Sequence, residues 1–366
     1  MTLIEKTFLL LLRNAFSGFL TTKNFPSLSK QEWHNLMDLA FKNGLNCEVL
    51  DAINLLPKEK KPPFELLIKW IGQAVISQKV YDYRKEVATE YASVLAKERI
   101  QCIVLKGLGI SRYYNKPENR GFGDFDCFLV KDGSPAFEKG MEIACEMGAV
   151  INNDCSYKHQ QIFYKKLMIE NHQFISNFDN TKKGVYIEKL LRQLIVSNTY
   201  QNVEGSDILV PPPHFQALHI LKHSLDDFLN DGLLLRQVYD WAVFLRAEQK
   251  NLDWKRLTED LNNCHLRIFC DALTTISLSY FGLQLSEGTM QLSLNTILAD
   301  EILQDTLTGN LSFGKDKTIF HKIRRIYHRI FFRMWHFRSI ATESYPFLLW
   351  KTVAFSSYIH RTVTLE

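Results

Sequence analysis

The sequence predicts an α+β fold in which a small mixed β-sheet lies between an N-terminal and a C-terminal helical region. Two changes of pattern lead to this class. Apolar residues recur at helical three- and four-residue steps in roughly the first hundred positions, short β-like runs begin at Ile100, and helical spacing returns from Tyr186. A chain of 366 residues is long enough for two or three domains. We expect boundaries that give segments 1–99, 100–185 and 186–366.

The N-terminal segment should be helical throughout. Ser29 has the residue type and position of a helix cap. Pro62 and Pro63 mark a break, because proline cannot continue a helix. Beyond them, apolar side chains at helical steps predict one long helix from Phe64 to Arg99.

The central segment should hold the sheet. Strands are expected at Cys102–Leu105 and Phe125–Val130, with a helix from Gly107 to Tyr114 between them. Ser134 should cap a helix that ends near Gly148. The remaining elements expected are strands at 149–152, 160–165 and 167–174, a hairpin at 200–210, and helices at 214–229, 233–248, 253–262, 265–282, 293–306 and 316–337.

Composition excludes several classes of protein. Seven cysteines, an odd number without a CxxC pair, indicate neither a disulfide framework nor a zinc site, and reduced thiols favour the cytoplasm. The sequence contains no run approaching ~20 apolar residues, so we expect no membrane span. The net charge of +4 is too small to imply nucleic-acid binding by itself.

Two aspartates open the strand expected at Phe125–Val130. Asp124 and Asp126 stand at positions i and i+2 and therefore point to the same face. The simplest alternative is an edge strand with two solvated acids. A third acid, Glu170, lies in the apolar run KLMIENHQF, where a carboxylate needs a partner. Three acids on adjacent strands could hold two divalent cations for an in-line phosphoryl displacement.

A glycine turn follows the strand CIVL. Gly107 would let the backbone approach a phosphate, and the helix that starts there would favour negative charge. Lys106 would add a point charge beside Gly107 and Gly109. A Gly-x-Gly pair is also found in ordinary strand-to-helix turns, so the turn gains meaning from the acids that follow it.

These motifs occur in an order that resembles the uncharacterised nucleotidyltransferase family. The order is LKG, RYY, R-x-F-x-DFD-x-x-LV and an IENH-type strand, and the similarity continues into HFQALHILKHSLDDFLNDGLLLRQVYDWAVFL, so that it covers about residues 100–245. That family belongs to the superfamily that includes DNA polymerase beta and many small-molecule nucleotidyltransferases.

The resemblance implies two-metal nucleotidyl transfer with Mg²⁺ or Mn²⁺. Asp124 and Asp126 would be metal ligands, and Glu170 would hold the catalytic metal and help to deprotonate the acceptor hydroxyl. Gly107 would lie under the triphosphate. The superfamily usually has Gly or Ser after this glycine, whereas Leu108 follows here. Whether Ser111, one helical turn further on, supplies the missing hydroxyl stays open.

Four further residues are candidates for the site. Arg120 could clamp a phosphate or be a solvated loop arginine. His172 shares the face of Glu170 and could bind substrate or a carboxylate, or be structural. His219 and His223, at i and i+4 on one helix face, should line a cleft between the sheet and the helices rather than bind zinc, or pack internally.

Two other features leave alternatives open. Arg236 and Asp240 are also spaced i, i+4 and could pair with each other. The segment 315–338 carries eight basic residues and one acid, and its basic face could hold RNA, an acidic partner or anionic lipid, or be simply solvated.

The function expected is metal-dependent transfer of a nucleoside monophosphate from an NTP to a hydroxyl or phosphate of a small-molecule or protein acceptor. A nucleic-acid acceptor is not favoured, because the central segment is not strongly basic. Two alternatives remain. One is a nucleotide-binding module without catalysis, and the other is an RNA-directed enzyme that uses the basic C-terminal helix.

Overall fold

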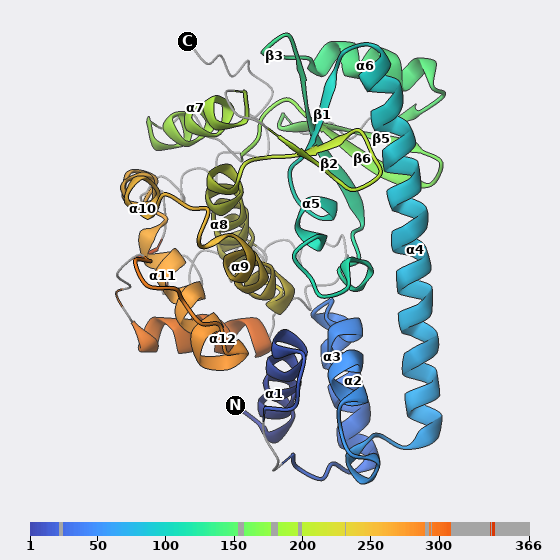
Figure 1. The fold of residues 1–366 in the computed structure, drawn as a ribbon, viewed down its shortest axis with the longest axis vertical. Coiled ribbons are helices and arrows are strands. Elements are labelled where there is room, and N and C mark those ends of the chain that lie inside the picture. Colours follow the sequence, from blue (N-terminus) through green and yellow to red (C-terminus); the bar gives the residue numbers. More distant parts are fainter. Residues whose placement is uncertain are drawn as a thin grey trace, which may run out of the picture.

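The chain folds into one mixed sheet surrounded by helices, which confirms the α+β class (Figure 1). The structure is a computed structural model. It describes residues 1–21, 25–152, 157–176, 182–196, 200–230, 232–289, 293, 295–308, 337 and 339–340. The helix expected at 316–337 lies outside these residues, apart from Phe337. In the part of the chain that is described, no helix is both long and apolar enough to cross a membrane.

Eight strands of the described residues form the sheet. They are β1 (Gln101–Val104), β2 (Asp124–Lys131), β3 (Ser134–Pro135), β4 (Val150–Ile151), β5 (His159–Tyr164), β6 (Leu167–His172), β7 (Gln201–Asn202) and β8 (Ile208–Val210). Their order is β4-β5-β6-β2-β1-β8-β7, with β3 paired to β2. The β2–β6 and β1–β8 pairs are parallel and the other pairs are antiparallel. Strand β2 is therefore central, between β1 and β6.

As expected, helices precede and follow the strands in the sequence. They are α1 (Leu3–Ser17), α2 (Lys30–Lys42), α3 (Asn46–Asn54), α4 (Phe64–Lys97), α5 (Leu108–Ser111), α6 (Phe137–Glu146), α7 (Lys182–Val196), α8 (Pro213–Asn230), α9 (Leu235–Glu248), α10 (Trp254–Asn263), α11 (Arg267–Ile276) and α12 (Thr296–Thr308). Of these, α5, α6 and α7 lie between strands. Short 3-10 turns occur at Lys58–Lys60 and Pro117–Asn119, and a π-type turn at Ser277–Phe281 follows α11.

Helix α4 connects two hydrophobic cores. At 34 residues it is about 51 Å long, and it runs along the whole side of the molecule from α2 and α3 to the sheet (Figure 1). Its first half buries Trp70 among the N-terminal helices, where the indole donates to the carbonyl oxygen of Asn46 at 3.0 Å. Its second half buries Tyr91 and Leu95 against the sheet. The helix thereby fixes the sheet relative to the N-terminal helices.

The N-terminal and C-terminal helices share one core, although the sheet separates them in the sequence. The rings of Phe16 and Tyr239 meet edge to face at 5.9 Å. The Tyr239 hydroxyl donates to the carboxylate of Glu48 at 3.0 Å, and Asn119 donates to the other oxygen of Glu48 at 3.0 Å. These contacts join α1, α3 and α9 into one helical assembly, which fixes the position of α9.

Three expectations about single elements were wrong in detail. Ser134 does not cap a helix. Asp132 and Gly133 both have positive φ, 50° and 76°, and form the two-residue turn between β2 and β3, so Ser134 pairs with Lys131 and α6 starts only at Phe137. The helix expected from Gly107 to Tyr114 is a single turn. The helix expected at 265–282 changes to the π-type turn after Ile276.

Candidate functional site

Strand pairing brings the three acidic residues to one face of the sheet. Asp124 and Asp126 lie on β2, and β6 runs parallel to it with Asp126 opposite Glu170. Leu167 and Ile169 on the other face of β6 are fully buried, and this apolar face fixes the register. The carboxylates of Asp126 and Glu170 are therefore neighbours, and Asp124 stands two residues away on the same face.

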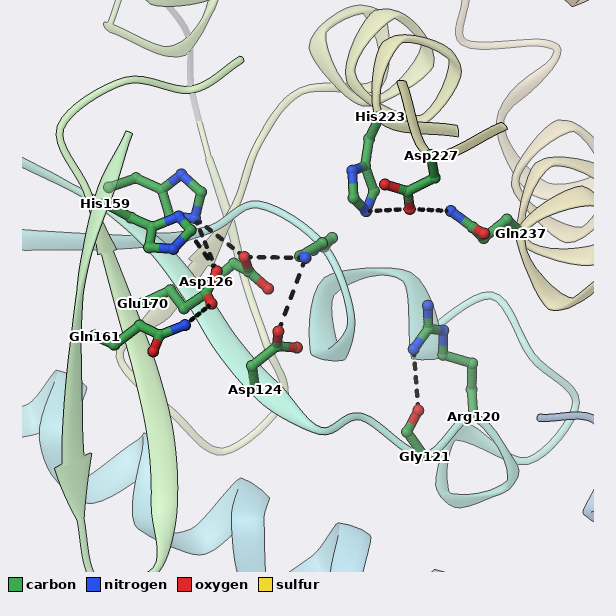
Figure 2. Close-up of polar contacts among 12 residues, drawn as sticks. Arg120, Gly121, Asp124, Asp126, His159, Gln161, Glu170, His223, Asp227 and Gln237 are labelled. Carbon is green, nitrogen blue, oxygen red and sulfur yellow. Dashed lines mark hydrogen bonds and ion pairs between the residues drawn. The ribbon is translucent and has the colours of Figure 1, made fainter. Parts of the chain in front are cut away.

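The three carboxylates offer one oxygen each within 4.8 Å of one another (Figure 2). Asp126 is 1% exposed and Glu170 is 7% exposed, while Asp124 is only partly buried. Oδ2 of Asp126 is buried and has no hydrogen-bond partner in the described part of the chain. A buried carboxylate oxygen without a donor is costly unless a cation meets it.

Lys106 balances part of the charge of this cluster instead of projecting toward solvent. Its Nζ lies 3.2 Å from Oδ1 of Asp126 and 3.9 Å from Oδ2 of Asp124. Burial alone would lower the pKa of Lys106, but the charges of Asp126 and Asp124 raise it above its ordinary value. The lysine expected to face a phosphate therefore faces the acids, and its ammonium lies close to both aspartates.

The two aspartates differ in their electrostatic environment. For Asp126, burial opposes ionisation, but Lys106 and His172 hold the pKa of the carboxyl well below its usual value. For Asp124, burial and then the charge of Asp126 raise the pKa. Asp126 is therefore a permanent anion, whereas Asp124 gains from any additional cation.

Two histidines stand beside the carboxylates. Nε2 of His172 lies 3.0 Å from Oδ1 of Asp126 and 3.7 Å from Oε2 of Glu170. His159, opposite His172 on β5, places Nδ1 3.5 Å from Oε2 of Glu170. His159, Glu170 and His172 form a second group whose possible ligand atoms lie within 4.8 Å of one another. Sequence reasoning missed His159, because only the antiparallel pairing of β5 with β6 brings it there.

The glycine turn has the backbone conformation that glycine allows. Gly107 has φ of 59°, and a Cβ there would come within 3.2 Å of Cβ of Phe122. Gly109 has a packing role, since a Cβ would lie 2.9 Å from Cγ1 of Val104. Ser111 is 1% exposed, and its hydroxyl donates to the carbonyl of Leu108 at 2.7 Å. The structure therefore does not bring the Ser111 hydroxyl to the site.

A cavity of about 310 Å³ opens beside Asp124, between the glycine turn and helices α8 and α9. Its lining includes Lys106, Gly107, Ile110, Arg120, Phe122, Gly123, Asp124, His219, Ile220, His223, Ser224, Asp227, Leu234, Arg236, Gln237 and Asp240. The volume is that of a small-ligand site, and polar groups reach it from the glycine turn, from α8 and from α9.

His219 and His223 lie on the wall of this cavity, and Figure 2 shows His223 facing it from α8. The rings of Phe215, His219 and His223 form a stack, with centroids 5.5 and 6.2 Å apart. Burial lowers the pKa of His219 to about 3 and that of His223 well below its ordinary value, so both are neutral. Within the described residues, neither belongs to a group of three that could hold a metal ion.

Arg120 is a buried ion-pair partner and not a solvated loop residue. It is 6% exposed, and its Nε and NH2 donate to both oxygens of Asp240 at 3.0 and 2.7 Å. The alternative pairing of Arg236 with Asp240 was wrong, because Arg120 reaches Asp240 from the loop before β2. Arg236 instead lies on the cavity wall, and sequence reasoning gave it no role in the site.

Comparison with known proteins gives one match. A family model described as "uncharacterised nucleotidyltransferase" matches residues 29–282. No curated protein and no solved structure matches the chain. The matched region begins before α2 and ends after α11, so it contains the sheet, the carboxylates and both cavity-lining helices. It covers well over half of the 366 residues, and the chain belongs to the uncharacterised nucleotidyltransferase family.

Proposed function

We propose that this protein transfers a nucleoside monophosphate from an NTP to a hydroxyl or phosphate of a small-molecule or protein acceptor, with the help of divalent metal ions. One observation carries the proposal. Asp124, Asp126 and Glu170 converge on one face of β2 and β6, and Asp124 also lines the cavity. The family to which the chain belongs supports nucleotidyl transfer as the reaction class.

The residues fit Mg²⁺ or Mn²⁺. The donor set consists of three carboxylates, which hard cations prefer, and no other described residue hydrogen-bonds to Oδ2 of Asp126. Asp124, Asp126 and Glu170 would hold the metal. When bound, it would neutralise charge on the phosphate oxygens and lower the pKa of the attacking hydroxyl.

The chain's own groups would then bind and orient the reactants. The acceptor oxygen forms a bond to the α-phosphorus, the bond from that phosphorus to the bridging oxygen breaks, and pyrophosphate leaves. Glu170 would take the proton of an acceptor hydroxyl. Gly107 would let the backbone approach the triphosphate, and Lys106, which is 24% exposed, can turn from the acids toward a phosphate when metal enters.

A second candidate is a nucleotide-binding module without turnover. The contact of Lys106 with both aspartates favours it, because an ammonium balances part of the acidic charge without any metal. An RNA-directed transfer would use the basic segment 315–338, which lies outside the described residues apart from Phe337. We also propose the cytoplasm as the compartment, since the six cysteines in the described part of the chain are free thiols.

The experiment that separates these functions measures pyrophosphate release. The purified protein is incubated with each of the four NTPs, Mg²⁺ or Mn²⁺ and a panel of hydroxyl and phosphate acceptors. Metal-dependent release that requires an acceptor supports transfer. NTP binding without release under any of these conditions would reject transfer in favour of the binding module. Release that requires RNA and falls steeply with salt would favour the RNA-directed enzyme.

A further inference from the structure

Arg236 is a cationic side chain on the cavity wall with few partners of its own. It belongs to α9, and its NH1 donates one long hydrogen bond, 3.3 Å, to the carbonyl oxygen of Gly121. Its Nε is shielded from solvent and has no hydrogen-bond partner among the residues that the structure describes. A guanidinium normally uses its five donors in a planar fork, so most of its capacity here is unused.

The carboxylate one helical turn further along α9 is already committed to other donors. Asp240 accepts the Arg120 guanidinium through both of its oxygens, and Oδ1 also accepts the Tyr114 hydroxyl at 2.6 Å. Arg120 also donates to the Gly121 carbonyl that Arg236 uses, at 3.0 Å, and Figure 2 shows this contact. The two guanidinium groups therefore share the carbonyl oxygen of Gly121, and only Arg120 pairs with the carboxylate of Asp240.

The other acids of the cavity have different partners. Asp124 lies 3.9 Å from Nζ of Lys106. Asp227 accepts the Gln237 side chain at 2.8 Å and lies 3.5 Å from Nε2 of His223. Among the ion pairs of the described residues, none includes Arg236. The charge of Arg120 is the largest cause of the lowered pKa of Arg236. The guanidinium therefore lies near a like charge, and no carboxylate of the described residues pairs with it within 4.0 Å.

The fold makes room for this arginine. Gly44, in the turn between α2 and α3, has φ of 65°, and a Cβ there would lie 3.1 Å from NH1 and 3.3 Å from Cδ of Arg236. The side chain thus lies against backbone on one side and faces the cavity on the other. A residue of this kind is fixed in place before a ligand arrives, which lowers the entropy cost of binding.

We infer that Arg236 binds a phosphate of the nucleotide, in the non-transferred β- and γ-phosphate part of the NTP. A phosphate oxygen pair matches the planar fork of a guanidinium. The same cavity is lined by Gly107 and Asp124, so a triphosphate whose α-phosphate approaches the carboxylates stays within reach of its wall. This inference rests on the proposed function and adds the residue that recognises the leaving group.

The test uses pyrophosphate, which is the leaving group itself and undergoes no transfer alone. The affinity of the full chain for pyrophosphate is measured by calorimetry in the presence of Mg²⁺. The affinities for ATP and AMP are measured in EDTA, which prevents turnover. Arg236→Met should weaken pyrophosphate and ATP binding about tenfold to a hundredfold, because one charge-assisted contact is lost. AMP, which lacks the β- and γ-phosphates, should change less than threefold. Arg236→Lys should lie between wild type and Arg236→Met.

Thermal unfolding separates binding from a structural role. Arg236→Met relieves repulsion by Arg120, so the ligand-free midpoint should stay the same or rise, while the upward shift that pyrophosphate causes should shrink. Arg256→Met, in which an arginine that is 55% exposed on α10 is replaced, is the matched control and should behave as wild type. If Arg236→Met does not fold, Arg236→Lys still tests the inference through the pyrophosphate affinity.

Three results would overturn the inference. Unchanged pyrophosphate and ATP affinity in Arg236→Met would exclude a phosphate contact. An equal loss for AMP and ATP would exclude recognition of the β- and γ-phosphates. Unchanged ATP binding with loss of pyrophosphate binding would assign the arginine to a phosphorylated acceptor. None of these measurements requires turnover, so failure of this inference is distinct from failure of the proposed transfer reaction.

Discussion

Nε2 of His172 lies 3.0 Å from Oδ1 of Asp126, while Nδ1 of the same ring lies 3.0 Å from the carbonyl oxygen of Phe174. A carbonyl only accepts, so Nδ1 carries a hydrogen. Nε2 then has two options. It carries a second hydrogen and donates to Asp126, or it presents a lone pair to a cation that the carboxylates also bind.

This relationship predicts that His172 contributes to metal affinity. Replacing His172 with Phe should weaken Mn²⁺ binding about tenfold or more, because one nitrogen donor or one hydrogen bond that orients Asp126 is lost. Mn²⁺ binding is measured by electron paramagnetic resonance titration of the protein without NTP. His34→Gln, on α2 and outside the cavity lining, is the control. An unchanged Mn²⁺ affinity in His172→Phe would leave His172 a purely structural role.

Replacing Asp124 and replacing Asp126 should have different effects on stability, although both residues are needed for activity. Asp126→Asn removes an anion that Lys106 and His172 stabilise, so the free energy of unfolding should fall by about 1–3 kcal/mol. Asp124→Asn removes a carboxylate whose ionisation burial opposes, so stability should stay the same or rise. Urea unfolding at pH 7 measures both.

Both variants should lose metal-dependent pyrophosphate release. Asp132→Asn, in the exposed turn at the other end of β2, should keep wild-type stability and turnover, since asparagine also accepts positive φ. Wild-type turnover in Asp126→Asn at saturating Mg²⁺ would show that Asp126 is not a metal ligand.

Lys106 should compete with metal ions for the carboxylates. In Lys106→Met the acids lose their ammonium partner and repel one another, so the metal-free protein should unfold at a lower temperature. Mg²⁺ should then raise the midpoint by more than it does in wild type, because the ion no longer displaces an ammonium. The measurement is thermal unfolding across a Mg²⁺ series. An equal Mg²⁺ shift in both proteins would contradict competition between Lys106 and the ion.

His219 should make the protein sensitive to acid. Burial lowers its pKa to about 3 in the folded protein, against an ordinary value of 6.5. Below pH 6.5 the His219 imidazole therefore binds a proton in the unfolded chain but not in the folded chain. The free energy of unfolding falls as the pH drops from about 6.5 toward 3. At pH 5 this one group should cost about 2 kcal/mol relative to pH 8.

His219→Phe should remove that dependence and keep the ring stack with Phe215. The measurement compares urea unfolding of wild type and variant at pH 8 and pH 5. Between pH 8 and pH 5 the free energy of unfolding should fall by less in the variant than in wild type. A parallel loss in both proteins would mean that another group causes the acid sensitivity.

The sequence by itself determined the order of the elements and the local part of the site. Periodicities of 3.6 and 2 are local properties, so the long helix at Phe64–Lys97 and the strands around Asp124–Lys131 and Leu167–His172 were recognisable from residue patterns. The spacing of Asp124 and Asp126 placed both on one face for the same reason. The order of motifs carried the family resemblance, which the match over residues 29–282 confirms.

Only the tertiary structure decided which distant residues meet these acids. The parallel register of β2 and β6 sets Asp126 opposite Glu170, and the pairing of β5 with β6 brings His159 to the site. The spacing of residues along the chain shows neither of these pairings. Arg120 reaches Asp240 across 120 residues and thereby leaves Arg236 facing the cavity. Side-chain partners of this kind depend on how helices and sheet pack together, and packing follows from the whole buried surface rather than from any one segment.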